Sequence, residues 1–306
     1  MLGIENISTY IPETKKSNYD LKEKFDIDDD FIENKIGVKF HALKDAGFKS
    51  SDMCIKAFEN LQKNAEINVE EIECCLVVTQ NPDFNIPHTA AIVHGKLDLP
   101  VNCAAFDISL GCSGYVYGLS SIISFMKSNG MKKGLLFTSD QYSDIVDETD
   151  KNTALLFGDA ATVSLISDAP CFVPIDFSFG TNGKDYKELM CNDKLYMNGR
   201  AVFSFTATTA PKHIKDLLEK NDLTDEDIQK YYLHQGSKYI IDTIRKRLKV
   251  DEAKVPFDMA EYGNTVSSSI PILLAKEIAK SPKGKIVLSA FGVGLSWASA
   301  IIEKIK

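Results

Sequence analysis

The stretch AFDISLGCSGYVYGL, residues 105–119, predicts a strand, a tight glycine turn and a helix that begins beside Cys112. Apolar residues recur at helical spacing between Gly114 and Ser128, namely Tyr115, Leu119, Ile122, Ile123 and Met126. Asn129 and Gly130 follow with the signature of a left-handed helix cap. This pattern places the Cys112 thiol at the N-terminus of a helix.

Cys112 is therefore predicted to be a reactive cysteine. Unpaired backbone N–H groups and the positive end of the helix dipole favour an anion, so the thiolate should form more readily than in a free cysteine. A thiolate is a nucleophile. On this stretch alone, the alternative is that Cys112 is a small buried apolar side chain, as most intracellular cysteines are.

Length, composition and charge limit the class of protein. The chain has 306 residues, 44% of them hydrophobic, which is enough for one large or two ordinary domains. Its seven cysteines are irregularly spaced, which fits neither a zinc pattern nor a secreted disulfide framework and favours a reducing cytoplasm. The N-terminus predicts a first strand rather than a signal peptide, and no run is long enough to span a membrane. The formal net charge of −8 argues against general nucleic-acid binding.

Two parts of the chain repeat the same order of elements. Residues 67–79 and 223–235 each follow a helix, the second of which is expected to begin near Ala210, and each runs from a polar helix end into an apolar strand. Residues 106–108 and 257–259 are similar predicted strands, and each is followed by a helix and another strand. Because the offsets nearly agree, we predict two structurally similar halves, 1–168 and 169–306, with α/β layers and mixed sheets.

Three residues with reactive side chains directly follow predicted strands, namely Cys112, His234 and Asn264. Ligands in such sheets collect beyond the carboxyl ends of strands, so the three should converge if the halves pack as mates. Together they could transfer an acyl group that Cys112 holds as a thioester. Taken singly, His234 could be a core histidine with satisfied hydrogen bonds, and Asn264 could be an ordinary turn residue.

Five motifs occur in order along the chain. They are DISLGCSGY at 107–115, FGDAA at 157–161, LHQ at 233–235, GNTVSSSIP at 263–271 and FGVGLSW at 291–297. Through these motifs the chain resembles the β-ketoacyl-[acyl carrier protein] synthase III family, and the resemblance runs nearly from end to end. It favours a nucleophilic Cys112 over a merely buried one.

The resemblance implies a thiolase-like fold, in which two pseudo-symmetric βαβαβαββ halves form a five-layer α-β-α-β-α arrangement. The half 1–168 would carry the nucleophilic cysteine, and the half 169–306 would carry the histidine and the asparagine. The implied reaction is an acyl transfer, the decarboxylative Claisen condensation of an acyl-thioester primer with malonyl-[acyl carrier protein].

The resemblance also implies a role for each residue of the site. Cys112 would hold the acyl group, and the backbone N–H groups of Cys112 and Val293 would form the oxyanion hole. His234 and Asn264 would donate hydrogen bonds to the thioester carbonyl of the malonyl group. Decarboxylation supplies the driving force, so no metal or redox cofactor is expected. The expected partners are acyl-CoA, an acyl carrier protein and a second copy of the chain, but neither nucleic acid nor a membrane.

Six residues are expected from the resemblance to bind substrate, namely Phe31, Lys35, Ile86, Phe203, Gly292 and Gly294. Phe31 stands where the family often has a tryptophan that stacks on the adenine of coenzyme A, and Lys35 replaces a usual arginine. Ile86 stands where a phenylalanine often limits the acyl pocket across a dimer interface. After His234-Gln235 the usual Ala-Asn is replaced by Gly236-Ser237. The resemblance therefore fixes neither the thioester carrier nor the acyl group.

Other interpretations of these features stay open. The basic cluster Arg245-Lys246-Arg247 could receive an acidic carrier protein, or it could be a solvated helix face. The chain could instead be a non-decarboxylating acyltransferase that acts on a hydroxyl or amine in polysaccharide or secondary-metabolite biosynthesis. Such enzymes often carry an acid in place of Asn264. A catalytically silent partner subunit is a third possibility, but such subunits usually lack a residue like Cys112.

Overall fold

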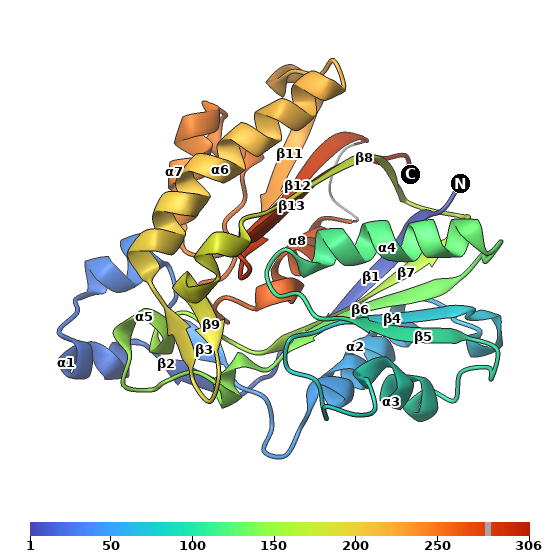
Figure 1. Ribbon diagram of the computed structural model, residues 1–306, viewed down its shortest axis with the longest axis horizontal. Coiled ribbons are helices and arrows are strands. Elements are labelled where there is room, and N and C mark those ends of the chain that lie inside the picture. The colour runs from blue at the N-terminus through green and yellow to red at the C-terminus, as the bar shows by residue number, and fades with distance from the viewer. Residues whose placement is uncertain (279–282) are drawn as a thin grey trace.

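The computed structural model describes residues 1–278 and 283–306 (Figure 1). Within them the main sheet has nine strands in the order β11-β12-β13-β8-β1-β7-β6-β4-β5. One side of the sheet comes from the first part of the chain: β1 (Gly3–Tyr10), β4 (Cys74–Val78), β5 (Ala104–Ile108), β6 (Gly134–Asp140) and β7 (Ala160–Ser167). The other side comes from later strands: β8 (Phe172–Thr181), β11 (Ile228–Leu233), β12 (Gly284–Gly292) and β13 (Ser296–Lys304).

The sheet is mixed, as predicted. Strand β4 lies parallel to both β5 and β6, and β11 lies parallel to β12, whereas the remaining neighbours are antiparallel. The two sides are joined where Ile4 of β1 pairs with Phe172 of β8. Strand β4 reads CCLVV and is buried throughout, which is typical of a strand that helices cover on both faces.

Helices cover the strands in layers (Figure 1). Helices α2 (Ser50–Asn64) and α3 (Thr89–Lys96) pack on the outer face of β4, β6 and β7. Helices α6 (Gly199–Lys220) and α7 (Lys238–Leu248) pack on the outer face of β11–β13. Between the two sides lie α4 (Gly114–Ser128) and α8 (Ser269–Glu277), whose apolar side chains join strands from both sides into one core. The predicted α-β-α-β-α order of layers is confirmed.

Shorter elements surround the rim of the layers. The strands among them are β2 (Lys15–Ser17), β3 (Phe40–Ala42), β9 (Leu189–Cys191) and β10 (Leu195–Met197), and the short α-helices are α1 (Lys22–Phe25) and α5 (Lys151–Ala154). The single-turn and irregular helices are η1 (Tyr19–Leu21), η2 (Phe31–Ile36), η3 (Val69–Glu71), η4 (Tyr142–Asp144), η5 (Gly183–Glu188), η6 (Asp225–Asp227), η7 (Glu252–Lys254) and η8 (Val266–Ser268). In the part of the chain that the structure describes, no helix is both long and apolar enough to cross a membrane.

The repeated pattern reappears in three dimensions, with two corrections. A short helical turn precedes the buried strand in both repeats, η3 before β4 and η6 before β11. Residues 257–259, however, form no strand, so the later side of the sheet has no counterpart of β5. Helix α6 begins at Gly199 rather than near Ala210, because Asn198 caps it and Pro211 lies inside it. The division into half-chains 1–168 and 169–306 stays a prediction.

Candidate active site

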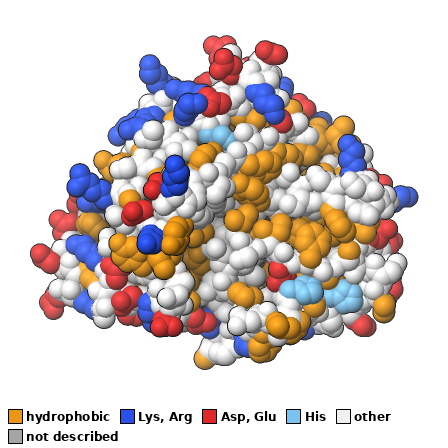
Figure 2. Space-filling view, viewed as in Figure 1, with side chains coloured by type: hydrophobic (Ala, Val, Ile, Leu, Met, Phe, Trp, Pro, Cys, Tyr) orange, Lys and Arg blue, Asp and Glu red, His pale blue; other side chains and the backbone are white. Residues whose placement is uncertain are grey.

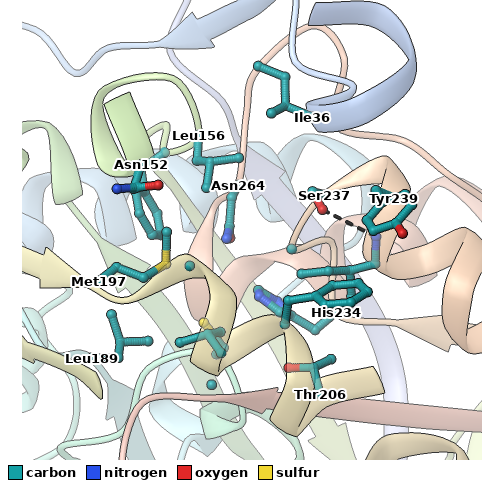
Figure 3. Close-up of a pocket in the computed structure, with 18 of the residues that line it drawn as sticks. Ile36, Asn152, Leu156, Leu189, Met197, Thr206, His234, Ser237, Tyr239 and Asn264 are labelled. Carbon is teal, nitrogen blue, oxygen red and sulfur yellow. Dashed lines mark hydrogen bonds between the residues drawn. The ribbon is translucent and has the colours of Figure 1, made fainter. Parts of the chain in front are cut away.

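Cys112, His234 and Asn264 all line one cavity of about 540 Å³. Figure 3 shows His234 and Asn264 in this cavity. Cys112 lies in the turn before α4, His234 directly follows β11, and Asn264 lies just before η8. The cavity therefore collects side chains from both sides of the molecule. All three residues are buried, with exposed fractions of 7%, 2% and 4% respectively.

The Cys112 turn is shaped by close packing. Helix α4 begins at Gly114, so the thiol lies at the N-terminus of the helix as predicted, and Gly130 has the expected positive φ of 68°. A Cβ atom on Gly292 would lie 2.7 Å from Cys112 Cβ and 2.9 Å from its Sγ, so only glycine fits there without displacing the thiol. This contact gives the predicted residue Gly292 a packing role beside the Cys112 thiol.

The protonation of Cys112 differs from the expectation. Burial and the nearby Asp140 carboxylate raise the pKa of the thiol to about 12, although backbone N–H groups of Cys112 and Val293 face the sulfur and lower the pKa. Desolvation of the charged form therefore outweighs the helix N-terminus in the closed cavity. The same two N–H groups are the predicted oxyanion hole, and they lie beside the Cys112 sulfur.

His234 is a neutral imidazole. Burial lowers its pKa to about 3. Its Nδ1 lies 2.8 Å from the Ser269 hydroxyl at the start of α8, and its ring packs edge-on against Phe291 at 5.6 Å. If the Ser269 O–H donates to Nδ1, the proton of the neutral ring is on Nε2. His234 can then donate one hydrogen bond into the cavity.

Asn264 is held by a network that fixes the orientation of its amide. The Val266 N–H donates to Asn264 Oδ1 at 2.9 Å, and the Asn264 backbone bonds Leu156 and Gly158. With Oδ1 occupied, Nδ2 is the end of the amide that faces the cavity (Figure 3). Val266 has a φ of 53°, which is unfavourable for a β-branched residue, and such strain concentrates at functional sites.

A buried carboxylate lies behind the site and was not anticipated from the sequence. Asp140, at the end of β6, accepts hydrogen bonds from the Gln80 N–H at 2.8 Å and from both the N–H and the hydroxyl of Ser267. Burial raises its pKa to about 6. Asp140 therefore bonds the loop that carries Asn264, through Ser267, and its charge also raises the pKa of the Cys112 thiol. The signal available in the sequence was an acid that closely follows the apolar run Leu135-Leu136-Phe137.

Cationic and aromatic side chains gather at the mouth of the cavity. The predicted residues Phe31 and Lys35 line it, with Lys35 Nζ 5.3 Å from the Phe31 ring centre. Lys151 Nζ lies 4.9 Å from the same ring, and Arg200 is exposed at the start of α6. Phe203 also lines the cavity. Sequence reasoning missed Lys151 and Arg200, since neither lies near a motif.

Two predicted substrate-binding residues do not line the cavity. Ile86 is 88% exposed on the loop between β4 and α3. Gly294 has a φ of 133° in the turn after Val293, where it shapes the turn without facing the cavity. Further lining residues, which lie outside the six predicted substrate-binding positions, are Ile36, Tyr142, Asn152, Leu156, Phe157, Leu189, Met197, Gly199, Val202, Thr206, Gly236, Ser237, Tyr239, Ile240 and Phe291.

Comparisons with known proteins agree with this geometry. Residues 106–183 match the family model described as 3-oxoacyl-[acyl-carrier-protein] synthase III, and residues 218–304 match the model of its C-terminal part. The chain is 34% identical to the β-ketoacyl-[acyl-carrier-protein] synthase III of Lactococcus lactis subsp. cremoris and 32% identical to that of Geobacillus kaustophilus, in both cases over 98% of each chain.

Solved structures give the same result for the fold. The 3-oxoacyl-(acyl carrier protein) synthase III of Pseudomonas aeruginosa has a TM-score of 0.92 at 28% identity, over 100% of this chain and 98% of that chain. The synthase III from Thermus thermophilus has a TM-score of 0.91 at 30% identity, over 99% of each chain. The predicted fold class is confirmed.

Proposed function

The chain belongs to the β-ketoacyl-[acyl-carrier-protein] synthase III family, of thiolase-like fold, and from that premise we propose that it is an acyltransferase that condenses an acyl primer with malonyl-[acyl carrier protein]. The observation that carries the proposal is the meeting of one thiol, one neutral imidazole and one oriented carboxamide in a single cavity. Each group suits one step of the reaction.

In the first step, Cys112 takes the acyl group from the primer thioester. The sulfur attacks the carbonyl carbon, and the oxyanion that forms accepts hydrogen bonds from the backbone N–H groups of Cys112 and Val293. The departing thiolate of the primer carries away the proton of the Cys112 thiol. Since the resting thiol has a pKa of about 12, the sulfur is a thiol until a thioester enters.

In the second step, the malonyl thioester occupies the same cavity. Nε2–H of His234 and Nδ2–H of Asn264 donate hydrogen bonds to its carbonyl oxygen, which gains negative charge as CO₂ leaves. The resulting enolate attacks the acyl carbonyl on Cys112, and the expelled Cys112 thiolate takes up a proton from solvent to return to the resting thiol. The low pKa of His234 supports a neutral hydrogen-bond donor in this step rather than a cation.

The mouth of the cavity supports phosphopantetheine thioesters as substrates. Lys35, Lys151 and Arg200 present positive charge to a phosphate, and Phe31 presents a flat ring to a base. We propose that these residues receive acyl-CoA and the arm of an acyl carrier protein.

An acidic carrier protein would meet only part of the predicted basic cluster. Arg245 pairs with Asp242 and Glu252, and Arg247 donates to the Ala207 carbonyl. Lys246, in α7, and Lys249, just after it, are exposed. These two lysines are the proposed contacts, since complementary charge raises the rate of encounter.

A homodimer is also part of the proposal. Strand β5 is an edge strand of the main sheet. An edge strand with free backbone groups readily pairs with another chain. An aromatic face lies beside it, formed by Phe106, Tyr117, Phe125, Phe177 and Phe179, and apolar side chains are visible over α4 and β8 in Figure 2. Ile86 would then contact the partner chain. Light scattering tests the dimer, and a monomer would contradict it.

The proposed reaction calls for no metal or redox cofactor and is placed in the cytoplasm. An acyl transfer without decarboxylation is less favoured. The free end of Asn264 is an N–H donor, which can stabilise an enolate, whereas an attacking hydroxyl would need a carboxylate there to accept its proton. No observation favours a catalytically silent subunit.

Malonyl-[acyl carrier protein] labelled in its free carboxyl group tests the function. We expect labelled CO₂ and a 3-oxoacyl product when an acyl-CoA primer is also present. Acylation of Cys112 without CO₂ would support the alternative acyltransferase, and absence of acylation would contradict both enzymatic functions.

A further inference from the structure

Thr206 places a buried hydroxyl without a partner in the wall of the cavity. The residue is 0% exposed, and it lines the cavity from α6. Its Oγ1 has no hydrogen-bond partner among residues 1–278 and 283–306. In Figure 3 the oxygen lies on the side of Thr206 that faces the other lining residues, below His234. Because an unpaired buried hydroxyl costs free energy, this group needs an explanation.

Several other polar side chains of the cavity are already engaged. The Ser237 hydroxyl accepts the Ile240 N–H at the start of α7, and Asn152 Nδ2 donates to Asp150 at 3.1 Å. The Tyr142 hydroxyl donates to Gln80 at 3.1 Å. The Thr206 hydroxyl thus differs from these polar neighbours in having no partner in the described part of the chain.

The position of Thr206 on α6 indicates which part of a ligand it meets. Arg200, Phe203 and Thr206 are three residues apart and line the same cavity, so they follow one face of the helix. Arg200 is exposed, Phe203 is half-buried and Thr206 is fully buried. Six residues of helix span ~9 Å. The face therefore descends from a cation at the mouth, past an aromatic ring, to a neutral hydroxyl inside.

We propose that the Thr206 hydroxyl binds an amide group of the pantetheine arm, an inference that rests on the proposed function. The arm joins a phosphate to a thiol through a chain that contains two amides. A hydroxyl both donates and accepts a hydrogen bond, which suits a neutral amide. The order of these residues along α6 supports the pantetheine arm as the ligand. If its phosphate binds Arg200, the arm passes Phe203 and then Thr206 before its thioester reaches Cys112.

The test compares Thr206→Val, which keeps the shape and loses the hydroxyl, with Thr206→Ser, which keeps the hydroxyl. The second-order rate constant for acetylation of Cys112 is measured by mass spectrometry for three acetyl thioesters. These are the thioesters of pantetheine, with two amides, of N-acetylcysteamine, with the one nearest the sulfur, and of propanethiol, with none.

We expect Thr206→Val to slow acetylation by the pantetheine thioester roughly three- to tenfold, the usual effect of one lost hydrogen bond. Thr206→Ser should stay within twofold of the original protein, and the propanethiol ester should react equally with all three proteins. A loss with N-acetylcysteamine as well assigns the amide next to the sulfur, whereas a loss with pantetheine alone assigns the outer amide.

Stability provides a second readout. If the hydroxyl is unpaired until a ligand binds, Thr206→Val should raise the melting temperature of the ligand-free protein, because it removes an unpaired buried polar group. An equal loss of rate with the propanethiol ester, no loss with any ester, or a lowered melting temperature would each overturn the inference. If the original protein is acetylated by none of the esters, the proposed function itself fails.

Discussion

The floor and the mouth of the cavity are built in different ways. At the floor, Cys112, His234 and Asn264 are nearly inaccessible, and each is fixed by packing or hydrogen bonds from neighbouring segments. At the mouth, Lys35 and Arg200 are exposed and come from separate segments. The groups proposed for the chemistry are therefore held rigidly by the fold, whereas the side chains proposed to recognise the thioester carrier lie at the surface.

Removal of the Cys112 thiol, the proposed nucleophile at the floor of the cavity, should have the largest effect on activity. Cys112→Ala leaves no atom that can hold the acyl group, so acyl capture should be lost and condensation should fall at least about 10³-fold. Intact-protein mass spectrometry after incubation with acetyl-CoA measures capture. Cys171→Ala, which changes a cysteine at the rim of β8, is the control and should be acylated normally. Persistent acylation of Cys112→Ala would place the nucleophile elsewhere.

Asn264→Ala should separate the two steps within the floor. Loss of the amide removes one donor to the developing enolate, so condensation should fall by about 10²- to 10³-fold, while acyl capture by Cys112 should stay within about threefold. The two rates are measured as CO₂ release and as acyl-enzyme formation. If Asn264→Ala and Cys112→Ala lose capture to the same extent, the roles assigned to these residues are wrong.

Asp140→Asn should change the pH dependence of the Cys112 thiol at the floor of the cavity. The carboxylate raises the pKa of Cys112, so its removal should lower that pKa and increase the thiolate fraction at any pH below it. Alkylation by iodoacetamide at pH 8 should speed up by roughly three- to tenfold, because one pKa unit is a tenfold change in thiolate. The buried Asp159, which bonds Ser143 and Lys44, provides the control variant Asp159→Asn. A slower reaction of Asp140→Asn would show that the carboxylate only shapes the site.

Substitutions at the mouth should have the smallest effects. Lys35→Ala and Lys151→Ala should each raise KM for acetyl-CoA about two- to fivefold, with less effect at high salt, because salt screens charges at or near the surface. Acetyl-pantetheine lacks phosphates, so its KM should not change. An equal increase of KM with both donors would mean that these lysines do not recognise phosphate.

The sequence predicted the parts of the site that depend on local patterns. Helical spacing located α4 from Gly114 to Ser128, and apolar strands followed by polar turns located Cys112 and His234. The fold class followed from the repeated order of elements together with the resemblance. Asn264 was predicted through a strand at 257–259 that does not exist, so its place in the cavity depends instead on its pairing with Phe157.

The remaining features depend on contacts between distant segments. The protonation of Cys112 follows from burial and from Asp140, neither of which a helix terminus reveals. Lys151 reaches the mouth because α5 lies against η2, as its contact with Phe31 shows. Thr206 lies in a threonine-rich stretch in which the sequence gives no reason to select one residue. Its place in the cavity wall becomes evident only from the packing of α6.

A pulse and chase on Cys112 follows the acyl group from its proposed capture to the product. The protein is loaded with an acyl-CoA, the peptide that contains Cys112 is weighed, and malonyl-[acyl carrier protein] is then added. We predict that the acyl mass appears on Cys112 and then disappears, with one CO₂ and one 3-oxoacyl-[acyl carrier protein] formed for each acyl group lost. An acyl group on another residue, or one that leaves Cys112 without CO₂, would contradict the account.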